Sequence, residues 1–526
     1  MRSFCDAEPI GQTNKGILAT ELELKLSLDE DARHRIAKLP VVRNFASGNA
    51  FRQRLRSTYF DTPDLSLSQK GTVLRVRQQG GQWIQTVKTT NEASGGLHQR
   101  GEFESRIPDA SPDYTRLVSE HDLKLFANPH LLQQMGPAFE TDFWRTSWHL
   151  HLPGGSIVEL CMDMGEVRKE SQTVSICELE LELKHGISNV LYEVALEIAR
   201  SVHVRIENTS KAQSGYSLLR PSGPKPVRRV PTDVGPDMTA EDAYVSILRN
   251  CLFQMQENET VILKTDDPGG VHQMRVGLRR LRTCVSLFQN FVPDLNRRIL
   301  GDDVRVFSRD LGSTRDWDVF LEDHLRPALT SLGMPDDCQN LLAVMESRRA
   351  EHYNTLRDTL VSREYHLAML RVSAWVACRD WRKALDPKRL AKFRKPLRGV
   401  ASQILSTGHQ KIQRRHAALN PGDVRARHRL RISVKQQRYA AEFFQGLYPP
   451  KSLRKYGNQL SELQDLLGKL NDASLANERL SNLRNPQVPD SIASYINGWY
   501  ARDAIYNQDQ FPVAWEKFQR QKMFWK

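Results

Sequence analysis

The chain has 526 residues, of which 26% are charged, and a formal net charge of +13 at pH 7. No apolar run approaches the roughly 18 residues of a membrane-spanning helix, and the N-terminal segment lacks the apolar core of a signal peptide, so we expect a cytoplasmic protein without a membrane partner. The seven cysteines show no C-x-x-C spacing, which argues against a disulfide framework and against a zinc site.

The positive charge is confined to one part of the chain. Residues 1–220 carry 26 Lys and Arg against 28 Asp and Glu, whereas residues 221–526 carry 49 against 34. An excess of this size predicts a polyanionic partner for the second part. The length predicts two or three domains.

The first 220 residues contain segments in which apolar and charged residues alternate, a pattern typical of β-strands. Glu21–Leu26 alternates acidic and basic residues with leucines, Leu74–Arg77 alternates arginines with apolar residues, and Cys177–Leu183 carries three carboxylates. The ordinary explanation of such a strand is an antiparallel sheet with one solvated face. Because some polar faces are purely acidic and others purely basic, a second interpretation stays open. Acidic strands would hold a divalent cation, and basic strands would hold the phosphate oxygens that the cation bridges.

These strands resemble those of the CYTH superfamily, the triphosphate tunnel metalloenzymes. Glu21-x-Glu23-x-Lys25 is similar to the E-x-E-x-K strand that opens this family, and further motifs keep the family's order over about residues 17–220. These motifs are Tyr59-Phe60-Asp61-Thr62-Pro63, Leu74-Arg75-x-Arg77, Lys88, Gly96–Arg100, Arg145, Asp163, Glu178/Glu180/Glu182 and Ser210-Lys211-Ala212-x-x-Gly215-Tyr216. The resemblance implies an N-terminal eight-stranded antiparallel β-barrel whose charged strand faces point into a tunnel.

The same resemblance implies a substrate, a metal and the roles of individual residues. The expected substrate is inorganic triphosphate, and the expected metal is Mg²⁺ or Mn²⁺. The residues that would bind the substrate are Lys25, Arg75, Arg77, Lys88, Arg100, Arg145 and Lys211. The metal would be held by Glu21, Glu23, Glu178 and Glu180, with Glu182 a weaker candidate further along its strand. Glu21, Glu23, Lys25 and Lys88 are the expected catalytic residues.

A proline-rich segment separates the two parts of the chain. Residues 221–236 contain five prolines and two glycines, which exclude a helix interior and a central strand. We therefore predict a linker over residues 221–237, between domains at 17–220 and 238–515.

Two segments of the second part, 156 residues apart, repeat one arrangement of basic residues. The register extends to a Leu-Gly step, since Leu311–Asp316 superposes on Leu467–Asp472. At about 100° per residue, the basic residues of each copy share one stripe of a helix next to an apolar arc. The first stripe is His272, Arg275, Arg279 and Arg282, and the second is His428, Arg431, Lys435 and Arg438. A solvated basic face is the ordinary explanation of one such helix, but duplication at fixed register favours an anion-binding function.

These helices resemble the CHAD domain, an α-helical repeat domain with pseudo-two-fold symmetry that binds inorganic polyphosphate. The paired H-x-x-R-x-x-x-[RK]-x-x-R segments, each followed by an L-G-x-x-[RN]-D turn, carry the resemblance over about residues 238–515. It implies polyphosphate binding by both stripes and by Arg280, which follows Arg279. The second copy has Lys435-Gln436 at these two positions and would bind more weakly there.

The expected fold class is α+β multidomain, and the expected function is metal-dependent hydrolysis of triphosphate to diphosphate and phosphate, because CYTH followed by CHAD resembles bacterial inorganic triphosphatases. Two alternatives stay open: a polyphosphate-binding or targeting protein with little catalysis, and another CYTH activity such as thiamine triphosphatase. Few aromatic residues interleave with the basic stripes, which argues against nucleic acid. Association with polyphosphate granules is a further expectation, and the sequence does not fix the oligomeric state.

Overall fold

The computed structural model describes residues 19–89, 95–121, 123–220, 223–292, 304–333, 336–420, 423–482 and 490–526. The chain divides into two compact units. The first comprises residues up to Gly223 together with Ser362–Asp380, and the second comprises Pro224–Val361 and Trp381–Lys526. Among the described helices, none has the length and apolar character that crossing a membrane requires.

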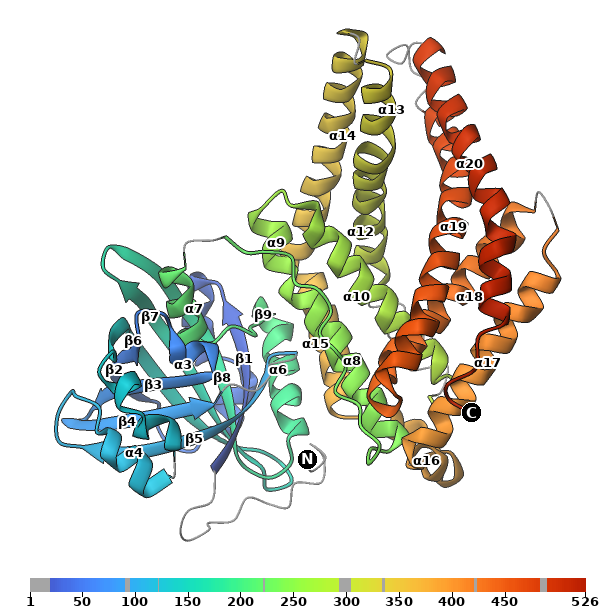
Figure 1. Ribbon diagram of the computed structural model, residues 1–526. Helices are drawn as coiled ribbons and strands as arrows, with labels where there is room; N and C mark the ends of the chain where they lie inside the picture. Colours follow the sequence, from blue (N-terminus) through green and yellow to red (C-terminus); the bar gives the residue numbers. More distant parts are fainter. Residues whose placement is uncertain are drawn as a thin grey trace. The chain divides into compact units, whose positions relative to one another are not determined.

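The first unit is built around one antiparallel sheet (Figure 1). Its strands are β1 (Ala19–Leu28), β2 (Phe51–Asp61), β3 (Thr72–Gln79), β4 (Gln82–Thr89), β5 (Leu97–Ile107), β6 (Gly136–His151), β7 (Ile157–Lys169), β8 (Gln172–His185) and β9 (Val204–Ile206). They follow the order β5-β4-β3-β2-β6-β7-β8-β1-β9. Because β1 also pairs with β5, with Glu21 opposite Arg100, the sheet curls back on itself. The family resemblance implied an eight-stranded antiparallel barrel, and the structure has a curled antiparallel sheet with nine described strands.

Short helices accompany the sheet in the first unit. They are η1 (Glu30–Ala32), α1 (Arg33–Ile36), α2 (Pro40–Phe45), α3 (Ser66–Gln69), α4 (Tyr114–His121), η2 (Lys124–Ala127), α5 (Pro129–Leu132), α6 (Asn189–Ser201), α7 (Lys211–Leu219) and α15 (Arg363–Ala377). Most of the apolar residues between these helices and the sheet belong to two clusters. One lies under α1, α2, α6 and α15, and the other under α4, η2 and α5.

The alternating strands turn their leucines, and not their charges, toward these helices. Leu24 and Leu26 of β1 and Leu179 and Leu181 of β8 are fully buried in the cluster under α6 and α15. The alternating charged residues therefore lie on the concave side of the sheet. This arrangement differs from that of an ordinary half-exposed sheet, because the convex, apolar face is the one that the helices cover.

Helix α7 packs against β6, β7 and β8, and a glycine makes this close approach feasible. A Cβ atom at Gly215 would lie 2.0 Å from the ring of Phe139. Ser210 caps the helix by accepting a hydrogen bond from the backbone N–H of Gln213, whose side chain in turn accepts one from the backbone N–H of Ser210. This capping box fixes the first residue of the helix, Lys211, whose side chain is buried.

Helix α15 is separated in sequence from the rest of the first unit but packs within it. Leu370, Ala374 and Ala377 belong to the same apolar cluster as the leucines of β1 and β8. Arg363 donates a hydrogen bond of 3.0 Å to the carbonyl oxygen of Ala199 in α6. The sequence assigned this helix to the 238–515 domain, because its amphipathic pattern does not reveal which neighbour covers it.

The second unit is helical. Its elements are α8 (Ala240–Glu257), α9 (Glu259–Lys264), α10 (Pro268–Leu287), α12 (Arg305–Asp318), η3 (Val319–Leu325), α13 (Arg326–Ser331), α14 (Asp336–Val361), η4 (Asp380–Ala384), α16 (Pro387–Phe393), α17 (Leu397–Ala417), α18 (Val424–Phe443), η5 (Gln445–Leu447), α19 (Pro450–Asn482) and α20 (Asp490–Gln519). The proline-rich segment forms neither helix nor strand from 223 to 235. Asn258 and Asn250 bind the main chain of this segment at Val227 and Val230.

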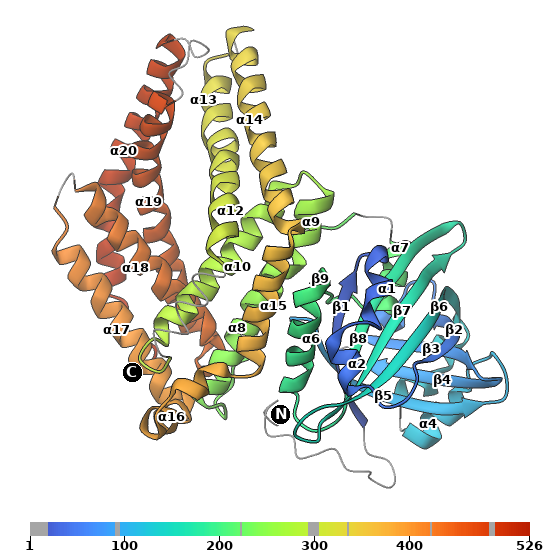
Figure 2. The ribbon, with the colours of Figure 1, turned by 180° about the vertical axis from the view of Figure 1, so that it is seen from behind.

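The duplication seen in the sequence extends to the helices. A shift of 156 residues places α10 on α18 from end to end, and it places α8 on α17 with an offset of one residue at the start. The same shift places α12 within α19 and α14 within α20. Figure 2 shows these helices from behind. The repeat therefore includes four helices that are equivalent in the two copies, and the basic stripes lie on the second of these in both copies.

Candidate active site and basic helices

A cavity of about 310 Å³ lies on the concave side of the curled sheet. It brings together nine of the residues that the sequence assigned to triphosphate or metal: Glu23, Lys25, Arg75, Arg77, Lys88, Arg145, Glu180, Lys211 and the weaker candidate Glu182. They come from β1, β3, β4, β6, β8 and α7, so no local segment of the chain contains the site. Two of the assigned residues, Glu21 and Arg100, have side chains outside the described part of the structure.

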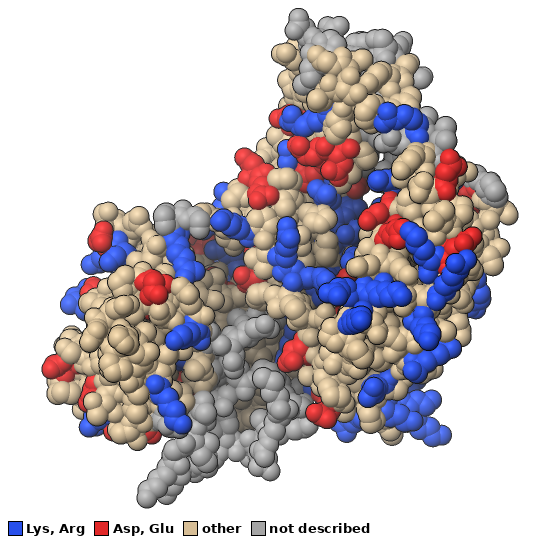
Figure 3. Space-filling view, viewed as in Figure 1, with Lys and Arg blue, Asp and Glu red and all other residues tan. Residues whose placement is uncertain are grey.

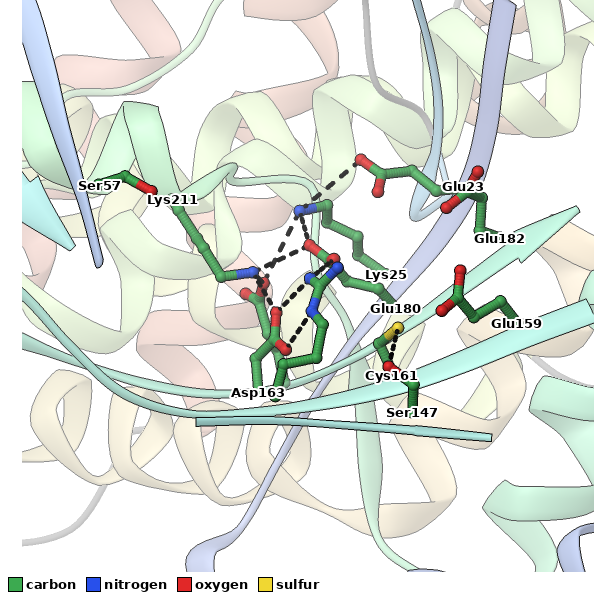
Figure 4. A network of polar contacts seen from close by, with 12 residues as sticks. Glu23, Lys25, Ser57, Ser147, Glu159, Cys161, Asp163, Glu180, Glu182 and Lys211 are labelled. Carbon is green, nitrogen blue, oxygen red and sulfur yellow. Dashed lines mark hydrogen bonds and ion pairs between the residues drawn. The ribbon is translucent and has the colours of Figure 1, made fainter. Parts of the chain in front are cut away.

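Glu180 is the centre of a buried ion-pair network at one wall of this cavity (Figure 4). Its carboxylate lies 2.5 Å from Nζ of Lys25 and 2.9 Å from Nζ of Lys211, and it also pairs with Arg145. Glu23 lies 3.7 Å from Nζ of Lys25. Lys25, Arg145 and Lys211 each pair with Glu180 of β8, so this carboxylate connects β1, β6 and α7.

Asp163 and Glu178 stand behind this wall and complete the network. Asp163 is fully buried, accepts two hydrogen bonds from Arg145, at 2.8 and 2.6 Å, and pairs with Lys211 at 2.7 Å. Glu178 pairs with Lys211 and lies 3.7 Å from Lys25. The carboxylates of Asp163, Glu178 and Glu180 thus neutralise the cations of Lys25, Arg145 and Lys211. Buried charges of either sign would be unstable without this pairing.

Burial and charge oppose each other in setting the pKa values of this wall. Burial alone would lower the pKa of Lys25 and of Lys211, but the carboxylates beside them raise both above their usual range. Burial alone would raise the pKa of Glu180, but Lys211 and Lys25 hold it well below its usual range. At neutral pH the two lysines and Glu180 are therefore all charged.

The opposite wall of the cavity, on β3 and β4, has an excess of positive potential. Glu102 of β5 lies 3.3 Å from Arg75 and 3.1 Å from Lys88, so it is shared by two cations. Burial, Arg75 and Arg145 lower the pKa of Arg77 to about 10. Burial would raise the pKa of Tyr59, but Arg75 and Arg77 lower it. Both shifts favour additional negative charge at this wall.

The buried carboxylates fit a divalent metal in their chemistry. Asp163, Glu178 and Glu180 offer oxygen atoms that all lie within 4.8 Å of one another. Carboxylate oxygens are the ligands that Mg²⁺ and Mn²⁺ prefer. Lys211 contacts all three carboxylates, so a cation bound at this group would compete with that ammonium.

The sequence left several residues of this site without a role. Asp163 was part of the family motif but not of the expected metal set, although it is the most deeply buried carboxylate of the network. Tyr59, Glu102, Glu104 and Lys184 also line the cavity. Glu102 and Glu104 flank Phe103 in an alternating strand, so the signal that identified β1 and β8 was present in β5 as well.

In the first copy of the helical repeat, the stripe on α10 contacts the Leu-Gly step on α12. Arg275 donates a hydrogen bond of 2.6 Å to the carbonyl oxygen of Gly312 and lies 3.3 Å from Asp316. A Cβ atom at Gly312 would lie 3.0 Å from this guanidinium, which explains a glycine there. Burial, together with Arg315 and Arg279, lowers the pKa of His272 to about 4, so this histidine is neutral at neutral pH.

In the second copy, Arg431 of α18 likewise lies close to the Leu-Gly step of α19. The guanidinium of Arg431 is the group nearest to a Cβ atom built at Gly468, at 3.7 Å. Arg438 donates a hydrogen bond of 3.1 Å to Gln464 and pairs with Glu442 at 2.6 Å. His428 is exposed, and Lys435 is half-buried.

Arg280 does not lie with the stripe. Its side chain is only 1% exposed and donates hydrogen bonds to Gln254 and Asn250 of α8. At about 100° per residue, this position is rotated well away from Arg275 and Arg279. This placement corrects the sequence prediction, because the donors of Arg280 serve packing within the unit.

Comparison with known proteins identifies both units. The CYTH domain family matches residues 19–216, and the CHAD domain family matches residues 246–481. An inorganic triphosphatase of Haemophilus influenzae is 28% identical over 209 residues, which are 39% of this chain and 56% of that protein. The chain thus spans little more than half the length of this curated relative.

Two solved structures are also similar to parts of the chain. The CHAD domain of the plant Ricinus communis is 29% identical, with 57% of this chain and 98% of that chain covered and a TM-score of 0.49. HpAC1 of Hippeastrum, an adenylyl cyclase candidate with a dominant triphosphatase activity, is 17% identical, with 38% and 95% covered and a TM-score of 0.27. The family matches account for both units, and the chain is a two-domain protein in which a CYTH domain is followed by a CHAD domain.

Proposed function

We propose that the CYTH domain hydrolyses inorganic triphosphate to diphosphate and phosphate with Mg²⁺ or Mn²⁺. The observation that carries this proposal is the cavity of about 310 Å³, which is lined by seven cationic side chains among the described residues. The cations are Lys25, Arg75, Arg77, Lys88, Arg145, Lys184 and Lys211. A compact polyanion matches this lining, and the positive potential on the β3–β4 wall favours it further.

The carboxylates account for a metal requirement. A binding site for a polyanion gains nothing from Glu23 and Glu180, which would repel it unless a metal intervened. Glu23, Glu178 and Glu180 would hold the metal, together with Glu21, as the family resemblance implies. We add Asp163 to this set because its carboxylate lies close to those of Glu178 and Glu180. The bound metal supplies charge neutralisation of phosphate oxygens and a polarised water.

The protein's own side chains position the substrate and stabilise developing charge. Phosphoryl transfer requires little beyond positioning and electrostatic stabilisation. Arg75, Arg77 and Lys88 would hold the phosphate oxygens from one wall. Lys25 and Lys211, kept charged by the carboxylates around them, would stabilise the negative charge of the transition state from the other.

A panel of phosphate compounds tests the proposed reaction. Phosphate release is measured from triphosphate, diphosphate, ATP, thiamine triphosphate and long polyphosphate, with Mg²⁺, with Mn²⁺ and with EDTA. We expect hydrolysis of triphosphate that requires a metal. Preference for thiamine triphosphate would assign a different CYTH activity, and binding without turnover would leave a sequestering protein.

Replacing Lys88 by Ala should lower kcat/KM for triphosphate about tenfold. This is the loss expected when one charged hydrogen bond to a phosphate disappears. Lys70→Ala is the matched control, because this exposed lysine lies just before β3 and does not line the cavity. Steady-state kinetics at fixed ionic strength check the result, and equal effects of the two changes would show that Lys88 acts only through overall charge.

We also propose that the CHAD domain binds inorganic polyphosphate through the stripes of α10 and α18. The residues of the two stripes support this proposal, together with the position of Arg275 and Arg431 beside the two Leu-Gly steps. The hydrogen bond to Gly312 and the ion pair with Asp316 fix the orientation of Arg275. The excess of positive charge in residues 221–526 supplies long-range attraction.

The double variant Arg275→Ala, Arg431→Ala should lose more affinity for long polyphosphate than either single variant. Binding is measured on the full chain in EDTA at several salt concentrations. Each lost contact should also reduce the salt dependence, because fewer counterions are released. Arg520→Ala is the control, since this arginine is highly exposed and far along the chain from both stripes. Retention of polyphosphate by the double variant would show that the duplicated motif serves packing.

A further inference from the structure

A second cavity, of about 540 Å³, lies within the helical unit and is larger than the cavity of the curled sheet. Residues after α10, residues of α16 and α17, and one face of α18 form its walls. Its volume falls within the range of about 300–1,000 Å³ that is usual for pockets that bind small molecules.

This cavity is separate from the basic stripe on α18. The helix contributes Ser433, Gln436 and Gln437 to the cavity and Arg431, Lys435 and Arg438 to the stripe. At about 100° per residue the two sets occupy different arcs of the helix. A ligand in this cavity would therefore not occupy the proposed polyphosphate stripe.

The segment that forms one side of the cavity is strongly basic in only one copy of the repeat. Residues 387–422, which include α16 and α17, contain nine Lys and Arg and no Asp or Glu. The equivalent residues of the first copy, 231–266, contain two Lys and Arg and seven Asp and Glu. Lys and Arg side chains are prominent around this part of the helical unit in Figure 3. The repeat does not require this difference at α17, whose equivalent in the first copy is the helix α8, whereas α16 has no helical equivalent there.

Three lysines of the segment line the cavity without acidic neighbours. They are Lys392, Lys395 and Lys411, and no carboxylate is among the described residues that line the cavity with them. Nζ of Lys411 donates to Gln436 at 3.3 Å, and burial, Arg415 and Arg414 lower its pKa. The lysines therefore create a positive potential that an anion would neutralise.

The remaining lining is more elaborate than inorganic phosphate requires. Five residues with side-chain amides line the cavity: Gln289, Asn290, Gln403, Gln436 and Gln437. The ring of Phe291 lies among them and stacks on Phe393, with 5.0 Å between the ring centroids. Val400 and Ile404 add an apolar surface. Amides that pair with base edges and an aromatic or apolar wall are the groups that bind nucleobases.

Among these amides, that of Gln437 is held in place by hydrogen bonds to its neighbours. Its Nε2 donates hydrogen bonds of 3.0 Å to the carbonyl oxygen of Leu405 and to the hydroxyl of Tyr456. The side chain is 1% exposed, and its Oε1 has no hydrogen-bond partner among the described residues. An acceptor is thus held beside Gly408, another residue of the cavity wall.

We propose that this cavity binds a free nucleoside polyphosphate. The base would lie against Phe291 and the amides, and the phosphates would lie at Lys392, Lys395 and Lys411. The helical unit would then have a nucleotide site on the α17 side of α18 in addition to the basic stripe. This site is independent of the reaction proposed for the CYTH domain.

Photolabelling of the full-length protein with 8-azido-ATP tests the proposal. Excess inorganic triphosphate is included to occupy the CYTH cavity and the basic stripes. We expect labelled peptides from residues 286–291, 400–411 or 433–437, identified by mass spectrometry, and loss of the label with excess ATP. Labelling confined to the CYTH domain, or removed equally well by triphosphate alone, would overturn the proposal.

Matched variants locate the phosphates and the base. Lys411→Glu should weaken labelling about tenfold, as expected for a lost charged contact, whereas Arg414→Glu makes the same charge change on an exposed part of α17 outside the cavity. Gln436→Leu should weaken ATP binding without changing charge. Thermal melting confirms that each variant is folded. Equal effects of Lys411→Glu and Arg414→Glu would show that ATP binds a diffuse basic surface. Stronger competition by a 20-nucleotide oligo(dT) than by ATP would show that the surface binds nucleic acid strands. Either result contradicts the proposed site.

Discussion

Replacing Glu180 by Gln should reduce the hydrolysis of inorganic triphosphate by about a hundredfold, the upper end of the range for groups that hold or support a metal. The carboxylate of Glu180 contacts Lys25, Lys211 and Arg145, and it belongs to the group of oxygens that can hold a cation. The amide keeps the shape of the side chain but has one neutral oxygen and no charge. Steady-state phosphate release at saturating Mg²⁺ or Mn²⁺ measures the loss.

The same change should strengthen binding of triphosphate in the absence of metal. In the structure Lys25 and Lys211 are neutralised by carboxylates, and removal of one carboxylate leaves their charge available for phosphate oxygens. Fluorescence or calorimetric titration in EDTA therefore separates this mechanism from simple unfolding, which would weaken binding and turnover together.

Asp142→Asn is the matched control for Glu180→Gln. Asp142 is also a carboxylate of the sheet and pairs with Arg54 and Arg56, but it is not part of the cavity lining. Its replacement should leave turnover and metal-free binding within about twofold of the wild type, because a partly exposed ion pair contributes at most about 1 kcal/mol. A Glu180→Gln variant with normal turnover would contradict the metal assignment.

Replacing Leu370 by Asp should abolish triphosphate hydrolysis although Leu370 does not line the cavity. Leu370 of α15 is 1% exposed and packs in the apolar cluster that contains Leu24 and Leu26 of β1. Loss of this burial, with a charge introduced in its place, should cost at least about 3 kcal/mol of stability in the first unit. Because β1 also carries Glu23 and Lys25, loosening of its apolar face displaces the site.

The control for Leu370→Asp is Leu405→Asp, which places the same charge at a fully buried position of α17 in the helical unit. This variant should weaken the second unit and leave triphosphate hydrolysis measurable. Limited proteolysis with peptide mapping shows which unit has opened in each variant.

A fragment that ends at Gly223 should be poorly soluble, since it lacks α15, the helix that covers the apolar cluster of β1 and β8. A soluble, active fragment of this kind would show that α15 is dispensable.

Several site residues could be predicted because their spacing encodes one strand face. Glu23 and Lys25, like Arg75 and Arg77, are two residues apart, so each pair must share a face in any extended strand. The period alone could not show which face is covered. The family resemblance indicated the charged face as the inner one, and the structure shows leucines buried under helices on the other.

Other residues of the site could not be predicted from local pattern. Asp163 stands alone among apolar neighbours in β7, and only the pairing of Arg145 with Asp163 and of Asp163 with Glu178 across three strands reveals its part in the network. The role of Glu102 likewise follows from Lys88 opposite it in β4. Strand pairings between distant segments set these contacts, and no short window of the sequence contains them.

In the helical unit, the sequence by itself determined the repeat, because a shift of 156 residues superposes whole helices. It also determined that His272, Arg275 and Arg279 share a stripe, since helical geometry is local. Only the tertiary structure decided that Arg280 is buried against α8 and that α15 leaves the helical unit to cover β1 and β8. A helix pattern specifies which face is apolar but not which neighbour buries it, because that choice depends on the packing of the whole fold.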